Sequence, residues 1–176
     1  MAIRRAHGFA LIDLVFVCGM IGLLCSIAVP RLLLAKQSAG AASAIGSLRA
    51  INSGELTYAL TCGSGFYAPD LVTLGTAPPG SNEPFISGGL GGANTMTKGG
   101  YIIQLSGTSF AGAPATCNGL AVGEAAQGFK SGADPADPSN VRFFGSNSNA
   151  IIYEDNSTLF TTIPELGEPP SGHTLR

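Results

Sequence analysis

A single acidic side chain, Asp13, lies near the start of a 22-residue apolar segment that runs from Phe9 to Pro30. An ionised carboxylate inside a membrane costs about 2.5–3.5 kcal/mol at the bilayer centre and less near the surface. A carboxylate kept at that cost usually has a cationic partner. The junction between Gly8 and Phe9 provides a source for one, because cleavage there would create a positively charged amine on Phe9. In an array of copies, the amine of one subunit could pair with Asp13 of the next.

The common types of N-terminal targeting segment explain these residues less well than cleavage after Gly8 and pairing with Asp13. A secretory signal peptide needs small residues at a cleavage site after the apolar core, and the stretch Cys25–Ala28 is a poor match. A lipoprotein signal would use the cysteine of that stretch, but Leu23 and Leu24 before it are too bulky. The residues flanking Arg4 and Arg5 do not support a twin-arginine signal. A plain membrane anchor accounts for the apolar length, but it accounts for neither the acid at position 13 nor the abrupt start of the segment.

One long helix is predicted from Phe9 to about Leu60. At 1.5 Å per residue it would extend about 75–80 Å. Residues 9–30 are apolar on all faces, which is typical of a transmembrane or filament-core helix, and Pro30 is expected to bend it because it lacks a backbone donor. Residues 31–60 are amphipathic and are expected to pack on a sheet through Ile45, Leu48, Ile51, Leu56 and Ala59. The small residues at 39–44 favour either simple helix propensity or a close helix–helix contact in an assembly.

The remainder, residues 61–176, is predicted to be a loop-rich head. From Cys62 onward it contains 19 of the 25 glycines and 10 of the 11 prolines. A turn with a short helix is expected at 65–75, and an irregular stretch with a brief helix near 85–90 is expected at 76–97. The predicted strands are 101–105, a weaker one near 126–131, and a hairpin of 141–144 with 150–154. Residues 159–176 are expected to form an extended tail, so the fold class is α+β with three or four antiparallel strands.

The four cysteines divide by location. Cys18 and Cys25 lie in the apolar helix and are interpreted as small packing residues. Cys62 and Cys117 lie in the head, where one disulfide is favoured over two buried free thiols. No CxxC pair or histidine cluster accompanies them, so no metal site is predicted.

The sequence predicts no catalytic residues and no cofactor. Its two histidines are His7, in the N-terminal leader, and His173, near the C-terminus, and no nucleophile motif is present. From Phe9 onward, 7 basic and 11 acidic side chains give a net charge of −4. With no basic patch and no aromatic platform, a nucleic-acid partner is not predicted. These features favour a structural or binding protein over an enzyme.

The N-terminus resembles a known protein family. The sequence Arg4-Arg5-Ala6-His7-Gly8 followed by Phe9-Ala10-Leu11-Ile12-Asp13-Leu14 is similar to the leader of type IV pilins and type II secretion pseudopilins. Pro30 occupies the position of the family's proline, 22 residues after the cut, and residues 38–58 resemble the second half of pilin helices. The match is detailed over about the first 60 residues. This chain departs from the family pattern at Asp13, where the family usually has Glu, and at Ala10, where it usually has Thr; the shorter acid reduces the reach of the ion pair.

The resemblance implies a pilin fold and a series of partners. A prepilin peptidase would remove residues 1–8 by cutting between Gly8 and Phe9, and would methylate the new amine. Asp13 would neutralise the amine of an adjacent subunit. The precursor would wait in the bacterial inner membrane until an assembly ATPase and a platform protein move it into a helical homo-oligomer. That filament would be a cell-surface pilus or a periplasmic pseudopilus.

Several alternatives remain open from the sequence. The leading expectation is a pilus subunit, and a type II secretion pseudopilin and a minor tip subunit are its rivals within the family. The head sequence does not show whether the subunit acts as an adhesin or in DNA uptake. A membrane-anchored binding module that never polymerises is the rival from another class. Because major pseudopilins can bind calcium, Asp134, Asp137, Glu154 and Asp155 are candidate oxygen ligands, although turn residues in a solvated loop are the favoured interpretation.

Overall fold

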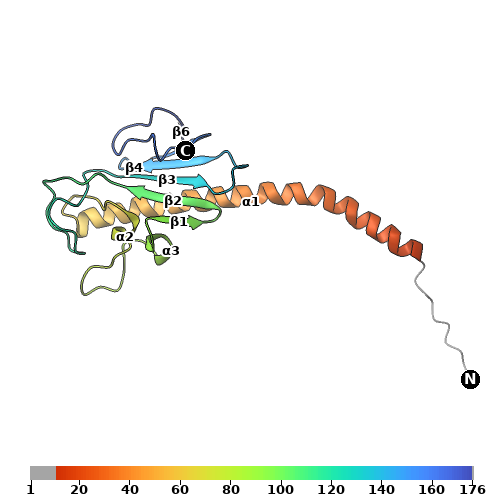
Figure 1. The fold of residues 1–176 in the computed structure, drawn as a ribbon, viewed down its shortest axis with the longest axis horizontal. Helices are drawn as coiled ribbons and strands as arrows, with labels where there is room; N and C mark the ends of the chain where they lie inside the picture. The colour runs from red at the N-terminus through yellow and green to blue at the C-terminus, as the bar shows by residue number, and fades with distance from the viewer. Residues whose placement is uncertain (1–10, 176) are drawn as a thin grey trace, which may run out of the picture. The chain divides into compact units, whose positions relative to one another are not determined.

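The computed structural model describes residues 11–175, which form two compact units divided between Ser38 and Ala39. One helix, α1 (Leu11–Thr61), begins in the first unit and ends in the second (Figure 1). The second unit also contains a six-stranded antiparallel sheet and two short helices. The α+β class and the long apolar N-terminal helix are therefore as predicted, whereas the sheet has more strands than expected.

The C-terminal part of α1 forms one side of the core of the head. Its fully buried side chains include Leu48, Ile51, Glu55 and Tyr58, which recur at helical spacing on one face. Of the residues predicted to face the sheet, Leu48, Ile51 and Ala59 are buried and Ile45 is partly buried. The prediction for Leu56 is wrong, because this side chain is 56% exposed. It lies one residue beyond Glu55, so it points about 100° away from the buried stripe.

The sheet is an antiparallel meander in which each strand pairs with the next along the chain. The strands are β1 (Thr95–Lys98), β2 (Tyr101–Ser106), β3 (Lys130–Pro135), β4 (Phe143–Asn147), β5 (Ile152–Asp155) and β6 (His173–Thr174). The prediction of three or four strands missed the two edge strands, β1 and β6. Both are short and largely exposed, so neither carries an apolar alternation in its sequence. Their strand geometry comes from pairing with β2 and β5.

The inner strands agree with the predictions in kind, with shifted boundaries. Strand β2 and the β4–β5 hairpin are present, and the turn of the hairpin includes Ala150 at a φ of 58°. The strand predicted near 126–131 is instead β3, which starts at Lys130. Ala126 forms isolated bridges to Tyr67 and Ser109, so its apolar surroundings reflect loop packing.

Both faces of the sheet are covered, which the sequence did not predict. Tyr101, Ile103 and Phe144 point into the core that α1 shares. On the other face, Leu159 and Ile163 are buried with Tyr153. Glycines on β3 and β4 make room for this second layer: a Cβ at Gly132 would lie 2.6 Å from Phe160, and one at Gly145 would lie 2.9 Å from Leu159. The expectation that residues 159–176 form an extended tail is therefore wrong.

The small residues at 39–44 allow the turn between β1 and β2 to approach α1 closely. A Cβ on Gly40 would lie 2.6 Å from the Gly99 carbonyl oxygen, and a Cβ on Gly99 would lie 2.7 Å from Ser43 Oγ. Gly99 also has a φ of +60°, which favours glycine. Gly40 and Ser43 therefore lie against a turn of the same chain, which is a reason for small residues at these positions that the sequence did not predict.

Two short helices complete the head. Helix α2 (Leu71–Leu74) lies within the predicted segment and is capped by Asp70, whose Oδ1 accepts a hydrogen bond from the Thr73 amide at 2.8 Å. Helix α3 (Gly88–Gly91) overlaps the brief helix expected near 85–90. Leu71, Leu74 and Leu90 are buried, so these turns close the core beside α1.

Candidate functional site

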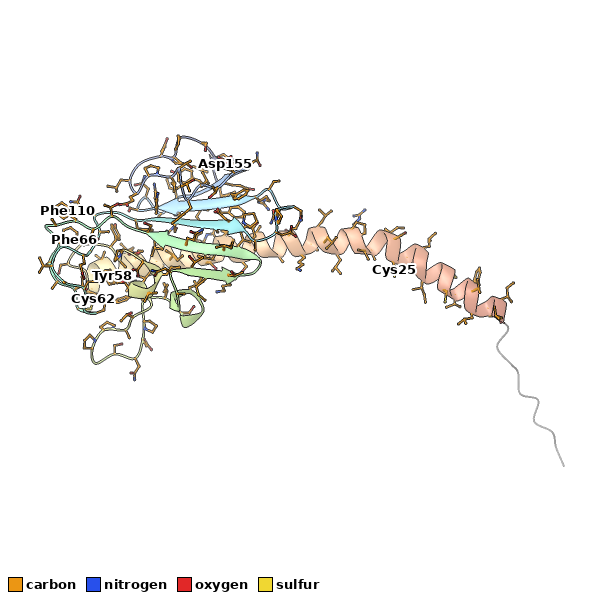
Figure 2. The ribbon with its side chains drawn as sticks, in the orientation of Figure 1. Cys25, Tyr58, Cys62, Phe66, Phe110 and Asp155 are labelled. Atoms are coloured by element: carbon orange, nitrogen blue, oxygen red, sulfur yellow. A yellow bond between two sulfur atoms is a disulfide. The ribbon has the colours of Figure 1, made fainter. Side chains whose placement is uncertain are left out.

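The first unit presents an apolar helix surface. Every side chain from Leu11 to Lys36 is exposed; the exposed fraction is 79% for Leu11 and 71% for Leu32. In Figure 2 the side chains of this part of α1, including Cys25, project outward from the helix. Among the described helices, α1 is the one that is long and apolar enough to cross a membrane. Unlike the core helix of a soluble protein, its most apolar stretch is unburied.

Asp13 lies in the first turn of the described part of α1. It is the only charged residue between Leu11 and Pro30, and the next charges along the chain are Arg31 and Lys36. No ion pair in the described part of the chain involves Asp13. A carboxylate in a first helical turn gains about 0.3–1 kcal/mol from the helix dipole. That gain is smaller than the cost of placing the same charge in hydrocarbon.

Of the other residues of the predicted processing and assembly site, the structure describes Pro30 but neither Gly8 nor Phe9. Gly8 and Phe9 lie outside the described residues, so their cleavage and the pairing of the new amine with Asp13 stay predictions. Pro30 lies inside α1, which continues through it. Because proline has no amide hydrogen, it leaves the carbonyl of Ser26 without its helical donor.

Small residues interrupt the bulky surface of the same helix. A Cβ built on Gly19 or Gly22 would meet nothing within 4 Å, so these positions are open notches. Cys18 and Cys25 are exposed free thiols. In lipid or between helices, small residues of this kind let backbones approach closely. This part of the chain can therefore bind a partner by burying its apolar side chains and by pairing Asp13 with one cation.

A disulfide between Cys62 and Cys117 confirms the predicted pairing in the head. The two Cα atoms are 4.9 Å apart, and the bridge joins residues separated by 55 positions. Cys62 directly follows α1, so the bridge ties the end of this helix to the 107–125 loop. Figure 2 shows Cys62 and Tyr58 at this end of the head.

The amide of Asn118 organises the same region and was not identified from the sequence. Its Oδ1 accepts hydrogen bonds from Tyr58 at 3.3 Å and from Thr116 at 2.8 Å, and its Nδ2 donates to the Thr73 carbonyl at 2.8 Å. One side chain thus joins α1, α2 and the loop. The position next to Cys117 is the only signal in the sequence that could have drawn attention to it.

The acidic residues considered as calcium ligands do not form a cluster. Among the described residues, no group of three or more His, Cys, Asp or Glu side chains could hold a metal ion. Glu154 instead pairs with Arg142 at 2.5 Å, and this hydrogen bond lowers its pKa. Asp155 accepts from Ser171 at 2.6 Å, and Asp134 accepts from Thr158 at 2.7 Å. Each of these three carboxylates therefore has a partner within the head, although burial raises the pKa of Asp134 and its Oδ1 accepts no hydrogen bond from the described residues.

Glu55 is a buried acid that sequence reasoning missed. It is 0% exposed; its Oε2 accepts a hydrogen bond from the Ala68 amide at 2.9 Å, and its Oε1 has no partner among the described residues. Burial raises the pKa of this carboxyl well above its ordinary value, and the nearby Asp70 adds to the effect. The spacing of residues 48, 51, 55 and 58 was the available signal, because it places Glu55 in the apolar stripe.

Comparison with known proteins adds no relative: no protein-family model, no curated protein and no solved structure matches this chain.

Proposed function

We propose that this chain is the structural subunit of a type IV pilus-like helical filament, assembled from the inner membrane after cleavage between Gly8 and Phe9. The observation that carries the proposal is the exposed apolar surface of residues 11–34 with one carboxylate in its first turn. The leader sequence and the disulfide-closed α+β head agree with that role.

Exposed apolar side chains at this density require a covering. Burying one Leu, Ile, Val, Phe or Met side chain yields about 1.5–3 kcal/mol, and many such side chains lie between Leu11 and Leu34. A bilayer supplies a covering for about 20 residues of helix. A bundle of identical helices supplies a second one, and small residues such as Gly19 and Gly22 support close packing in it. A subunit with this surface can therefore exchange lipid for neighbouring copies.

Asp13 supports a filament over a simple anchor. A plain anchor gains nothing from a carboxylate at this depth and bears its desolvation cost. In a filament the acid would meet the cleaved amine of the next subunit, and this pair would fix the axial register of insertion. The peptidase, the assembly ATPase and the platform protein belong to the same proposal.

Two further roles compete with this one. A type II secretion pseudopilin would use the same N-terminal machinery in protein export, and it differs in where the polymer forms. The disulfide across a large loop favours a pilus subunit over a pseudopilin. A membrane-anchored binding module that never polymerises would keep the apolar helix in lipid permanently.

The decisive experiment measures processing and polymerisation together. Mass spectrometry of the mature protein is expected to find N-methyl-Phe9 as the first residue. Electron microscopy of sheared surface fibres is expected to show filaments that contain the chain. Retention of Met1 in the mature protein would contradict the proposal.

Variants at residue 13 separate the filament from the anchor. We expect Asp13→Ala to lose incorporation into filaments while it still inserts in the membrane, and Asp13→Glu to keep incorporation. Glu83→Ala is the matched control, since Glu83 is an exposed acid in the head. Equal polymerisation of the Asp13→Ala and Glu83→Ala variants would exclude the assembly role of Asp13.

A further inference from the structure

The turn that follows β5 contains a modification sequence that the filament role does not use. Asn156-Ser157-Thr158 is the only Asn-X-Ser/Thr sequence in the chain, although the chain has eight asparagines. This tripeptide is the acceptor sequence of N-linked glycosylation, and it is meaningful in a surface loop of an exported protein. Whether this tripeptide can act as an acceptor therefore depends on where Asn156 lies in the structure.

Asn156 is displayed on the surface, unlike the asparagines that have a structural role. Asn156 and Ser157 are both exposed, and the described residues provide no hydrogen bond to the Asn156 carboxamide. Its backbone amide donates to Asp155 Oδ1 at 2.7 Å, which fixes the start of the turn. Figure 2 shows Asp155, the preceding residue, at the periphery of the head. By contrast, Asn147 is 0% exposed and its amide donates to the Pro164 and Gly167 carbonyls.

The turn is held at both ends. Asp155 accepts a hydrogen bond from Ser171 at 2.6 Å, and Thr158 donates to Asp134 Oδ2 at 2.7 Å. Leu159, the next residue, is 0% exposed. These contacts keep the backbone of the turn in place while the Asn156 side chain is exposed to solvent. A bulky group on Asn156 would therefore displace no part of the core.

We propose that Asn156 is a site of N-linked glycosylation. The donor would be an oligosaccharide linked to a lipid diphosphate. A bond forms between Asn156 Nδ2 and the anomeric carbon of the sugar, the bond from that carbon to the diphosphate oxygen breaks, and the amide nitrogen loses one proton. The lipid diphosphate leaves with the electron pair, so no oxidant or reductant is needed.

The timing of the transfer follows from Thr158. In the folded head its hydroxyl donates a hydrogen bond to Asp134, so the transferase recognises the tripeptide before this hydrogen bond forms. The glycan must then be accommodated by the finished fold. The exposed position of Asn156 meets this requirement, whereas a glycan at the buried Asn147 would not fit.

The test is peptide mass spectrometry of the full chain purified from the cells that produce it. We expect the peptide containing Asn156 to carry added sugar mass, and we expect that mass to disappear in Asn156→Gln. Thr158→Ser is expected to keep the modification because it preserves the hydroxyl, and Thr158→Val is expected to lose it. Asn82→Gln, at an exposed asparagine outside the acceptor sequence, is the matched control and is expected to stay modified. An unmodified Asn156 in the wild-type protein overturns the inference.

This inference rests on the proposed function in one respect, because transfer requires the head to leave the cytoplasm. The two failures are distinguishable. Filaments built from subunits with an unmodified Asn156 would refute the glycosylation site and leave the filament role intact. A glycan on Asn156 in a protein that keeps Met1 and never polymerises would refute the filament role alone.

Discussion

The two parts of α1 have the same helical backbone, but their side chains differ in exposure. From Leu11 to Lys36 every side chain is exposed, and most are large and apolar. From Gly40 to Ala59 one stripe is buried and the other face is exposed, with Leu48 at 0% and Arg49 on the surface. A single backbone geometry therefore serves a segment that needs an external covering and a segment that is covered by its own chain.

This contrast shows where the stability of each part originates. The head has its own core, a disulfide and hydrogen-bonded polar groups, so it has the features of an independent folding unit. Within the described residues, the N-terminal half of α1 has its helical backbone hydrogen bonds and one local bond from the Ser26 hydroxyl to the Leu23 carbonyl, but no buried core. Under the proposed function, lipid or neighbouring helices would replace water around its apolar surface and so lower its free energy.

The largest expected effect comes from separating the two parts. We expect the full chain to fractionate with membranes and the chain without residues 1–34 to be a soluble head, because the deletion removes the exposed apolar surface before the head. Cell fractionation measures the change. The thermal transition of the head is expected to stay the same in both proteins. Aggregation or unfolding of the shortened chain would mean that the head depends on the removed helix.

The disulfide provides the next test, and it concerns the head alone. For a bridge across 55 positions, the chain-entropy relation gives about 4 kcal/mol of stabilisation. We expect Cys62→Ser with Cys117→Ser to lose a large part of this in denaturant unfolding of the head. Cys18→Ser with Cys25→Ser is the control, since those thiols are exposed and free. A similar loss in the control pair would contradict the division between the two regions.

A matched pair of leucines tests the two faces of the helix within the head. Leu48 is 0% exposed and Leu56 is 56% exposed, although both lie in the same part of one helix. Truncation of a buried leucine costs about 2–5 kcal/mol, so Leu48→Ala should lower the unfolding free energy by an amount in that range. Leu56→Ala should change it by about 0.5 kcal/mol or less. Urea unfolding of both variants measures the difference, and equal losses would show that the buried stripe is assigned wrongly.

The smallest expected effect is a pH dependence caused by Glu55. Its pKa is raised in the folded head, so the unfolded chain releases this proton first as the pH rises above about 4.5. The contribution of Glu55 is therefore fully present below that pH and is lost as the pH rises toward the folded-state pKa. The groups that face it are Asp70 and Tyr58, together with the Ala68 amide.

Glu55→Gln isolates this effect, because glutamine keeps the shape of the side chain and does not ionise. Unfolding free energies measured from about pH 4 to about pH 8 should fall more steeply for the wild type than for Glu55→Gln. Asp155→Asn serves as the control for a partly exposed acid with a lowered pKa, whose contribution has the opposite sign. Parallel curves for the wild type and Glu55→Gln would show that the buried acid does not control the pH dependence.

Local patterns determined what could be predicted about this protein. The apolar run from residue 9, the lone acid at Asp13 and the pair Cys62 and Cys117 are visible in the sequence because each depends on residue type and position alone. Strand β2 was also predictable, because its side chains alternate between buried and partly exposed positions, and the β4–β5 hairpin was predictable from two short apolar runs around a turn of Ser and Asn residues. The long helix followed from composition over many turns.

Only the tertiary structure decided the remaining features, since each depends on partners distant in the sequence. Strands β1 and β6 are strands because β2 and β5 supply their hydrogen bonds. The partner of the buried Glu55 carboxylate is the Ala68 amide, 13 positions later, which the helical spacing of the sequence does not specify. Gly40 meets Gly99, and Leu159 covers Gly145, through contacts that no local pattern encodes. Backbone pairing and close packing join segments by shape and hydrogen-bonding capacity, so the sequence of either segment alone does not contain them.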